Sequence, residues 1–300
     1  MTTKSLVNAT KMIAIYLVFL ILYTMGIFPT LISLVLPLPI IIYSVQTRKL
    51  SELLLMFIAC LLGSFLLTSF FGFLMTLLYG ASGIILGWGF VKKWPYWQRI
   101  LNSAILYMLG FPVIIYVLTG TTLTEASQAV FNESLNMLIS MVPEAGSQFE
   151  TLQNLMVTIV PKLMPTMLLL AGIAISFMSD LIAQLTLKRL RLEVTSFGDI
   201  RNFQLGRSLA MVYLGSQFGL LFINMTGIQV ILLNIMLLLN VLFVVQGSIV
   251  LFSFFKKRNK TLPIFILVIL FLFNATIALS MLGVMDALFD YRNRSKMQDL

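Results

Sequence analysis

Asp180 lies within a long apolar segment, with Ser176 and Gln184 one helical turn to either side. At 3.6 residues per turn, these three side chains share one face of a helix. Ionisable groups in apolar helices are costly to bury and usually face protein or water. We therefore expect Asp180 and Gln184 to contact a bound solute. An ion pair of Asp180 with Lys188 or Arg189, about two turns further on, is an alternative explanation.

Other polar residues interrupt the apolar segments of the last third of the chain. Tyr213, Gln217 and Asn224 fall on one side of a helix and form a polar stripe. Gln246 and Asp286 occur in the two apolar segments that follow. Each of these residues could contact a ligand. Each could instead form a hydrogen bond between membrane helices, which contributes about 0.6 kcal/mol.

The residue types that nucleophilic or metal catalysis requires are scarce in this sequence. There is no histidine, Cys60 is the single cysteine, and no acidic cluster has metal-ligand spacing. No P-loop pattern Gly-x-x-x-x-Gly-Lys-[Ser/Thr] occurs either. We predict that the protein is not an enzyme, and we expect no catalytic residue, metal or cofactor.

The composition is that of a membrane protein. Of the 300 residues, 59% are hydrophobic and 10% are charged, whereas soluble domains carry about 25% charged residues. Apolar runs of about 17–25 residues, each able to span about 30 Å of hydrocarbon, recur along the chain. The net charge of +9 comes from short basic clusters beside these runs. Such clusters are typical of topology signals and headgroup contact, not of nucleic-acid binding. We predict an all-α, polytopic transmembrane bundle whose partner is the lipid bilayer of the plasma membrane.

Turn signals divide the chain into eight or nine expected spans. Gly26 and Pro29 break the first apolar run, and residues 68–72 break the long run over 51–91. The nine spans are expected at residues 12–27, 31–45, 51–69, 73–91, 100–118, 163–187, 208–225, 229–255 and 262–286. The alternative with eight spans treats residues 12–45 as one kinked or re-entrant element.

The polar interval 119–155 orients the chain. Between Arg99 and Lys162 the sequence contains no Lys or Arg. Because short basic loops stay on the cytoplasmic side of a membrane, we expect this interval to be extracellular. The N-terminus and the loop that contains Lys92, Lys93 and Arg99 are then cytoplasmic.

Two capping boxes predict two short amphipathic helices within this outer loop. Thr122 and Glu125 begin the first helix, which should end at Pro143, and Ser147 and Glu150 begin the second. We expect the pair to rest on the outer membrane surface, or to form a lid over an outward-facing cavity.

Gly80, Gly83 and Gly87 share one face of the expected span over 73–91. A face of small residues lets another helix approach closely. We expect tight packing within the chain here, or contact with a membrane-protein partner.

Two short motifs occur near the end of the chain. They are Gln246-Gly247 in a late span and the terminal pattern Leu282-Gly283-x-x-Asp286-x-x-x-Asp290-x-Arg292-x-Arg294. With these motifs, and in hydropathy and length over nearly the full chain, the sequence resembles the YybS-like family of Gram-positive bacterial membrane proteins. The resemblance implies a multi-pass protein of the bacterial plasma membrane and carries no activity with it.

The first six spans have a second, more distant likeness. It rests on the Pro-rich second segment, the turn at Arg48-Lys49 and the pattern Tyr79-Gly80-x-x-Gly83-x-x-x-Gly87. In these features the chain is similar to the six-helix substrate-binding (S) components of energy-coupling-factor vitamin transporters, and to the rod-shape protein MreD. The likeness implies an S-component-like six-helix core over 1–190 and an extension of about three helices over 191–300. Residues 12–27 lack the Ala-x-x-x-Ala surface by which S components dock on their energising partner.

These features favour binding or transport of a vitamin or another small molecule. The candidate ligand-binding residues are Asp180, Gln184, Tyr213, Gln217, Asn224, Gln246 and Asp286. The alternative function is a non-transporting scaffold in cell-envelope assembly, as the MreD likeness implies.

Overall fold

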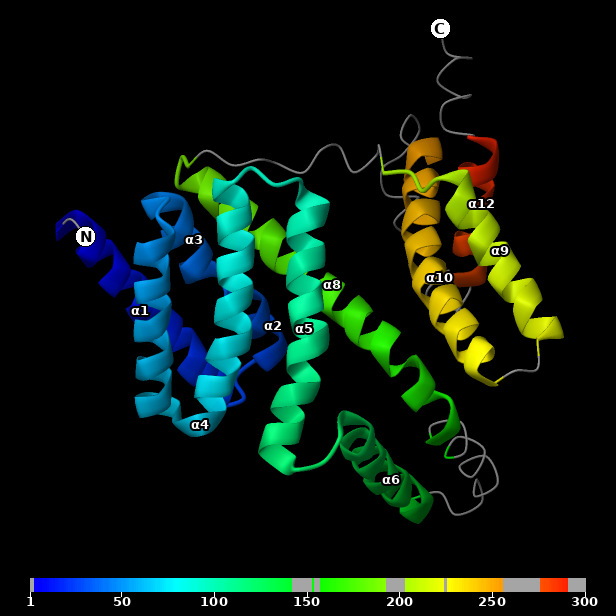
Figure 1. The fold of residues 1–300 in the computed structure, drawn as a ribbon, viewed down its shortest axis with the longest axis horizontal. Coiled ribbons are helices and arrows are strands. Elements are labelled where there is room, and N and C mark those ends of the chain that lie inside the picture. The colour runs from blue at the N-terminus through cyan, green and yellow to red at the C-terminus, as the bar shows by residue number, and fades with distance from the viewer. Residues whose placement is uncertain are drawn as a thin grey trace, which may run out of the picture. The chain divides into compact units, whose positions relative to one another are not determined.

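The computed structural model describes residues 3–141, 153, 157–192, 203–223, 226–255 and 276–290. Within these residues all regular structure is helical (Figure 1), which confirms the predicted all-α class. The chain separates into two compact units, unit 1 over residues 1–196 and unit 2 over residues 197–300. Each unit is described by itself.

Six helical stretches of the described residues are long and apolar enough to cross a membrane. They are Ser5–Thr24, Pro29–Thr47, Leu50–Val91, Tyr96–Thr119, Val160–Arg189 and Gly227–Ser253. Large apolar side chains cover their outward faces, where Leu66 is 82% exposed and Leu109 is 62% exposed. Apolar surface on this scale suits contact with lipid, so the predicted membrane bundle is confirmed.

In unit 1 the chain reverses direction near Gly26, after the first helix has ended. Helix α1 (Thr3–Thr24) is followed by Gly26 and Phe28, which have positive φ angles of 75° and 44°. Helices α2 (Pro29–Val35) and α3 (Leu38–Thr47) then pack back against α1. The predicted break at Gly26 and Pro29 is therefore confirmed, and residues 12–45 form more than one element.

Helix α4 (Leu50–Val91) contains 42 residues, about twice the length that one crossing requires. Ser69 interrupts it with φ 64° and ψ −169°. The two halves, residues 50–68 and 70–91, lie side by side and are joined by this turn (Figure 1). The sequence predicted the break between residues 68 and 72, and the structure confirms it.

The glycine face of α4 packs within the chain. A Cβ added to Gly83 would lie 2.9 Å from the Pro37 carbonyl oxygen, and one added to Gly87 would lie 2.7 Å from Ser44 Cβ. The close approach that the glycines predict is thus made to α3. A partner protein at this face stays a prediction, and its helix would have to displace α3.

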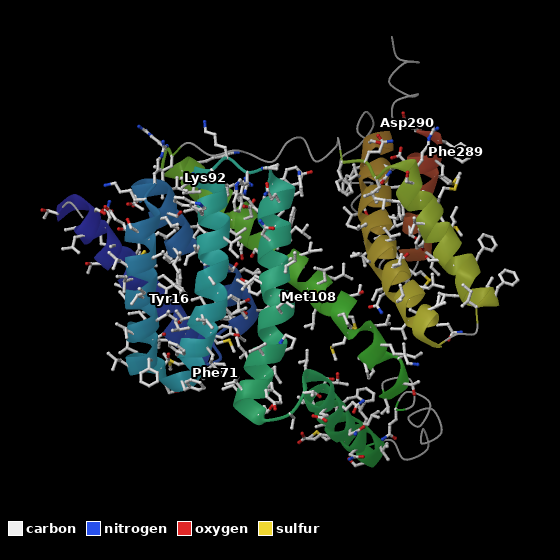
Figure 2. The ribbon with its side chains drawn as sticks, viewed as in Figure 1. Tyr16, Phe71, Lys92, Met108, Phe289 and Asp290 are labelled. Atoms are coloured by element: carbon white, nitrogen blue, oxygen red, sulfur yellow. The ribbon has the colours of Figure 1, made fainter. Side chains whose placement is uncertain are left out.

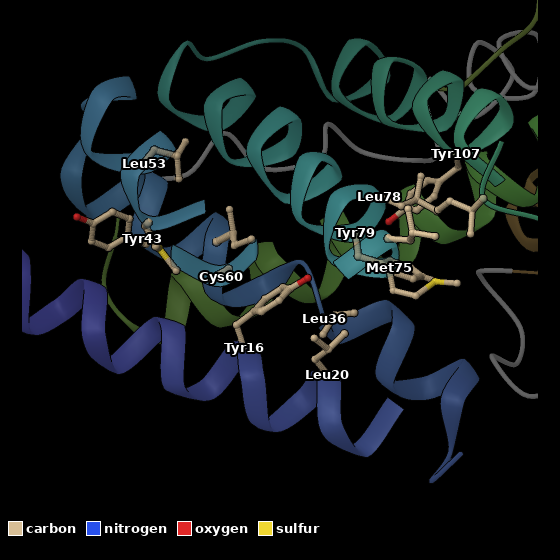
Figure 3. Packing of buried hydrophobic residues seen from close by; sticks show 14 of the residues in the cluster. Tyr16, Leu20, Leu36, Tyr43, Leu53, Cys60, Met75, Leu78, Tyr79 and Tyr107 are labelled. Atoms are coloured by element: carbon tan, nitrogen blue, oxygen red, sulfur yellow. The ribbon is translucent and has the colours of Figure 1, made fainter. Parts of the chain in front are cut away.

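Three more helices complete unit 1, and buried side chains fill its centre. They are α5 (Tyr96–Thr119), α6 (Leu123–Met141) and α8 (Val160–Arg189). The core joins α1, α3, α4 and α5 with Leu36, which follows α2, and its large members include Tyr16, Leu20, Leu36, Tyr43, Leu53, Cys60, Met75, Leu78, Tyr79 and Tyr107 (Figure 3).

Helix α6 begins at the first predicted capping box. The Thr122 N–H donates to Glu125 Oε2 at 2.8 Å, and the Glu125 N–H donates to Thr122 Oγ1 at 3.3 Å. This reciprocal pair satisfies two backbone donors that the first helical turn would leave free. The second predicted outer helix, after Ser147, falls largely outside the described residues.

Unit 2 contains α9 (Arg207–Phe222), α10 (Thr226–Phe255) and α12 (Thr276–Phe289). Helices α10 and α12 meet at backbone distance. A Cβ added to Gly247 would lie 1.9 Å from the Leu279 carbonyl oxygen, and one added to Gly283 would lie 2.2 Å from the Phe243 carbonyl oxygen. The ninth expected span, 262–286, is described only from residue 276 onward.

Candidate functional site

Arg99 and Asp180 form an ion pair in the interior of unit 1. Arg99 Nε donates to Asp180 Oδ1 at 3.0 Å and Nη2 donates to Oδ2 at 3.1 Å, with both side chains fully buried. Gln184 adds a third hydrogen bond to the carboxylate, from Nε2 to Oδ2 at 2.7 Å. The cation beside Asp180 is therefore Arg99, not the Lys188 or Arg189 considered from the sequence. The prediction that Arg99 lies in a loop is wrong, because Arg99 belongs to the first turn of α5 and its side chain is buried.

Neighbouring groups hold the Arg99 guanidinium in place. Its Nη1 donates to the Trp94 carbonyl oxygen at 2.8 Å, and its Cζ lies 4.1 Å from the centre of the Phe90 ring. Gly89 provides the space, since a Cβ there would lie 2.6 Å from Arg99 Cγ. A buried guanidinium needs such fixed acceptors and an aromatic face in place of water.

Three buried serines continue the polar contacts one helical turn further into the bundle. Ser82 and Ser103 share a hydrogen bond of 2.8 Å between their hydroxyl oxygens, and Ser176 donates to Ser103 at 2.9 Å. Ser103 follows Arg99 by four residues on α5, and Ser176 precedes Asp180 by four on α8. The serines thus join the second half of α4, α5 and α8 directly beside the ion pair.

Tyr107 occupies the next turn of α5. Its buried ring lies 5.6 Å from the Tyr79 ring and 5.7 Å from the Phe111 ring, measured between centroids. From Arg99 to Tyr107 the helix rises about 12 Å, a substantial part of a hydrocarbon layer of about 30 Å. We call this set the polar column. Its members are Ser82, Arg99, Ser103, Tyr107, Ser176, Asp180 and Gln184.

The polar column is suited to hydrogen bonding rather than to covalent or metal chemistry. Its two charged members, Arg99 and Asp180, neutralise each other, and its other members are hydroxyls and an amide. In the described part of the chain, no group of three or more His, Cys, Asp or Glu residues could hold a metal ion.

A second buried carboxylate lies in unit 2. Gln246 Nε2 donates to Asp286 Oδ2 at 2.8 Å, and Gln246 Oε1 accepts a hydrogen bond of 2.9 Å from the Leu205 backbone N–H. Gln246 and Asp286 are fully buried. The amide therefore connects α10 with α12 and with the segment that precedes α9.

The predicted stripe on α9 is not assembled into one site. The Tyr213 hydroxyl donates to Asn240 Oδ1 on α10 at 3.0 Å. Gln217, in contrast, is exposed, and Asn224 lies outside the described residues. The buried face of α9 consists of Ala210, Tyr213 and Ser216, and Gln217 lies beside this face.

Unit 2 also has a surface hollow of about 260 Å³. It is lined by Gln204, Leu205, Gly206, Arg207, Ala287 and Asp290. The Gln204 amide donates to Asp290 Oδ1 at 2.9 Å, so this bond joins the segment before α9 to the end of α12.

The structure brings the predicted residues together in two pairs. Asp180 and Gln184 lie in the polar column of unit 1, and Gln246 and Asp286 form the buried pair of unit 2. Sequence reasoning missed Arg99 as a member. Arg99, Ser103 and Tyr107 follow each other at intervals of four residues, and this polar face of α5 was a signal that could have found it.

Comparison with known proteins gives a family but no fold relative. The family model described as "Predicted membrane protein (DUF2232)" matches residues 12–287. "Uncharacterized protein YybS" of Bacillus subtilis (strain 168) is 28% identical over 309 residues, which cover 98% of this chain and 99% of the relative. No solved structure matches the chain. The predicted YybS-like resemblance is confirmed, and the likeness to S components and MreD stays a prediction.

Proposed function

We propose that this chain, which belongs to the DUF2232 family of predicted membrane proteins, binds or transports a small solute through unit 1. The observation that carries the proposal is the polar column. Ionisable and hydroxyl groups inside a lipid-facing bundle are costly, and they commonly line the paths of substrates or ions. Apolar packing would stabilise a purely structural bundle at lower cost than a buried ion pair.

The polar column would serve a solute in two ways. The serine hydroxyls of Ser82, Ser103 and Ser176 can each donate and accept hydrogen bonds. The Arg99–Asp180 pair below them holds α5 and α8 in register, so these hydroxyls keep fixed positions. Such preorganisation lowers the entropic cost of binding.

A thermal-shift screen of the detergent-purified full chain tests this function. The panel would contain vitamins, nucleobases, lipid precursors and metal ions. A compound at 100 times its dissociation constant should stabilise the fold by about 2.7 kcal/mol. The shift should be lost in Ser103→Ala, within the column, and kept in Ser134→Ala, which is exposed on α6. If no compound shifts the well-folded wild type, the solute-binding proposal is rejected.

The orientation in the bacterial plasma membrane is part of the proposal. Lys92 and Phe71 mark opposite ends of the second half of α4 (Figure 2), and Lys49 lies just before the first half. Because the halves are antiparallel, Lys49 and Lys92 lie at the same end of α4, which is then cytoplasmic. Helix α6 belongs to the loop 119–155, which we place outside.

Cysteine labelling in intact cells tests this orientation. A membrane-impermeant maleimide should react with Ser134→Cys on α6 without permeabilisation, and with Lys93→Cys only after it. The wild type is a suitable background, because its single cysteine, Cys60, is buried. The reverse labelling pattern would place the basic ends outside.

The packing of unit 1 favours a second candidate, the non-transporting scaffold for cell-envelope assembly. Gly83 and Gly87 pack closely on α3, and a Cβ on Gly172 would lie 2.7 Å from the Ala104 carbonyl oxygen of α5. A bundle with helices this close suits a rigid platform. Capture of one partner complex from native membranes, reproducible and unaffected by any solute, would support the scaffold. A purified monomer stabilised by a small molecule would contradict it.

A further inference from the structure

Four fully buried hydroxyl groups of unit 1 have no hydrogen-bond partner among the described residues. One belongs to Ser44 on α3, and the other three belong to Tyr16 on α1, Thr76 on the second half of α4 and Tyr107 on α5. Tyr16 and Tyr107 belong to the same core cluster and point into it (Figure 3). Each of the helices α1, α4 and α5 therefore places one unpaired hydroxyl oxygen in the interior of unit 1.

The spacing of these groups differs from that of an ordinary hydrogen-bonded network. The Thr76 hydroxyl lies close to Tyr16 without reaching hydrogen-bond geometry, and Ser82 lies close to Tyr107 in the same way. Tyr16 is also within electrostatic range of Tyr107. Tyr16 therefore interacts with each of the other two residues, and none of the three hydroxyls has a hydrogen-bond partner in the described part of the chain.

Leaving such groups unpaired is unfavourable, and apolar replacements of similar shape exist. A buried hydroxyl loses its hydration without compensation unless a partner donates to it or accepts from it. Phe and Val would fill the positions of Tyr and Thr without this cost. Unpaired buried polar groups in native proteins therefore call for a bound water or ligand.

The surroundings define the chemistry of that ligand. Met75 and Leu78 provide apolar walls, and Tyr79 and Phe111 pack on the Tyr107 ring. Tyr16 and Tyr107 belong to a cluster of apolar and aromatic side chains, and the charges of the nearby polar column are already paired with each other. The ligand group should be uncharged and able both to donate and to accept a hydrogen bond.

We infer that Tyr16, Thr76 and Tyr107 form a binding site for an uncharged hydroxyl-type group, supplied by bound water or by a neutral solute. The inference rests on the proposed function for the solute case and names the class of solute. It also assigns Tyr16 of α1, which is outside the polar column, to the same internal path.

Single hydroxyl deletions test the site, because an unpaired and a paired hydroxyl respond in opposite directions. Tyr16→Phe, Thr76→Val and Tyr107→Phe should each lower the Tm of the detergent-purified full chain by about 2–4 °C if the hydroxyl binds a ligand group. The decrease in Tm of the triple variant should be smaller than the sum of the three single decreases, because one ligand group binds all three hydroxyls. A Tm that is unchanged or higher in the single variants, both in solute-free protein and with a stabilising compound present, would overturn the inference.

Two matched controls calibrate the response. Tyr43→Phe removes a buried hydroxyl that is bonded to Ser5 at 3.2 Å, and it should lower the Tm. Tyr116→Phe removes a hydroxyl from a residue that is 60% exposed, and it should leave the Tm unchanged. Size-exclusion profiles identify any variant that fails to fold, and for that position Ala replaces Val at Thr76 or Leu replaces Phe at a tyrosine.

The solute panel separates the two sources of the ligand group. Losses of Tm in solute-free protein indicate bound water, whereas losses that appear only with a stabilising neutral compound indicate the solute. Either result supports the site. A flat solute panel combined with Tm losses in the solute-free variants would reject the proposed function and keep the water site, so the two failures are distinguishable.

Discussion

Each unit buries a carboxylate beneath a glutamine amide, but the surroundings of the two carboxylates differ. In unit 1, Gln184 contacts Asp180 from the same helix, and Arg99 forms a bidentate pair with it from α5. In unit 2, Gln246 reaches Asp286 from another helix, next to a crossing of α10 and α12 at two glycines. Asp180 lies beside the hydroxyl groups of the polar column. Asp286, in contrast, connects two helices through Gln246. Similar residues therefore belong to a polar interior in unit 1 and to a helix junction in unit 2.

The largest effect should come from removing the cation of unit 1. Arg99→Leu leaves Asp180 buried without its guanidinium, which should reduce the free energy of unfolding by about 3–5 kcal/mol. The double variant Arg99→Leu, Asp180→Leu should recover most of that loss, because no isolated charge remains. Thermal unfolding of the two variants and of the exposed control Lys93→Leu measures the difference. A double variant no better than the single one would mean that the pair acts mainly through packing.

The helix junction of unit 2 should respond to added volume. Gly247→Ala places a methyl group against a backbone carbonyl of α12 and should cost about 3 kcal/mol. Gly80→Ala in unit 1 should cost less, since its new methyl would meet side-chain atoms of Phe57 and Ile40, which can shift, and no backbone atom. Gly215→Ala, with open space around it, should be neutral or stabilising. Equal losses at Gly247 and Gly80 would remove the distinction between the two units.

The two glutamines provide a direct comparison. Gln246→Leu removes hydrogen bonds to both Asp286 and the Leu205 N–H, and it should cost about 2 kcal/mol. Gln184→Leu should cost less, because Asp180 keeps its two bonds to Arg99. Unfolding midpoints of the two variants, measured under the same conditions, give the ranking. The opposite ranking would show that the amide, not the guanidinium, is the main partner of Asp180.

The smallest effect concerns the turn through which α4 contributes both of its halves to unit 1. Ser69 has a backbone conformation that only glycine adopts readily. Ser69→Gly should therefore raise the free energy of unfolding by about 1 kcal/mol. Ser134→Gly, at a helical position of α6, should lower it by up to about 1 kcal/mol. A loss of stability at both positions would indicate that Ser69 is not strained.

Local signals in the sequence predicted much of the fold. Apolar run length predicted the membrane helices, the turn in α4 was expected near Ser69, and the capping box at Thr122 begins α6. These features depend on residues close together in the chain. Tight packing of the glycines of α4 could also be expected, because small side chains permit close approach whatever the partner is.

The candidate site was harder to predict, because its contacts join distant parts of the chain. Arg99 follows two other basic residues of a loop, and charge alone does not distinguish an inward from an outward side chain. Its partner is 81 residues away, and no periodicity relates the two positions. Gln217 shows the opposite problem. A helical wheel places it beside Tyr213, but the contact face of α9 is narrower than the polar stripe.

The separation of Arg99 from Asp180 also has a consequence for biosynthesis. Ribosomes add about 5–20 residues per second, so the 81 residues between these positions require about 4–16 seconds. During that interval the nascent chain carries a guanidinium whose carboxylate has not yet been made. Since an unpaired charge is unfavourable in hydrocarbon, α5 should wait with its first turn at the aqueous boundary. When α8 enters the membrane, Asp180 can pair with Arg99, and the first turn of α5 can then move into the bundle. The rate at which unit 1 assembles would therefore depend on when α8, its last helix, is inserted.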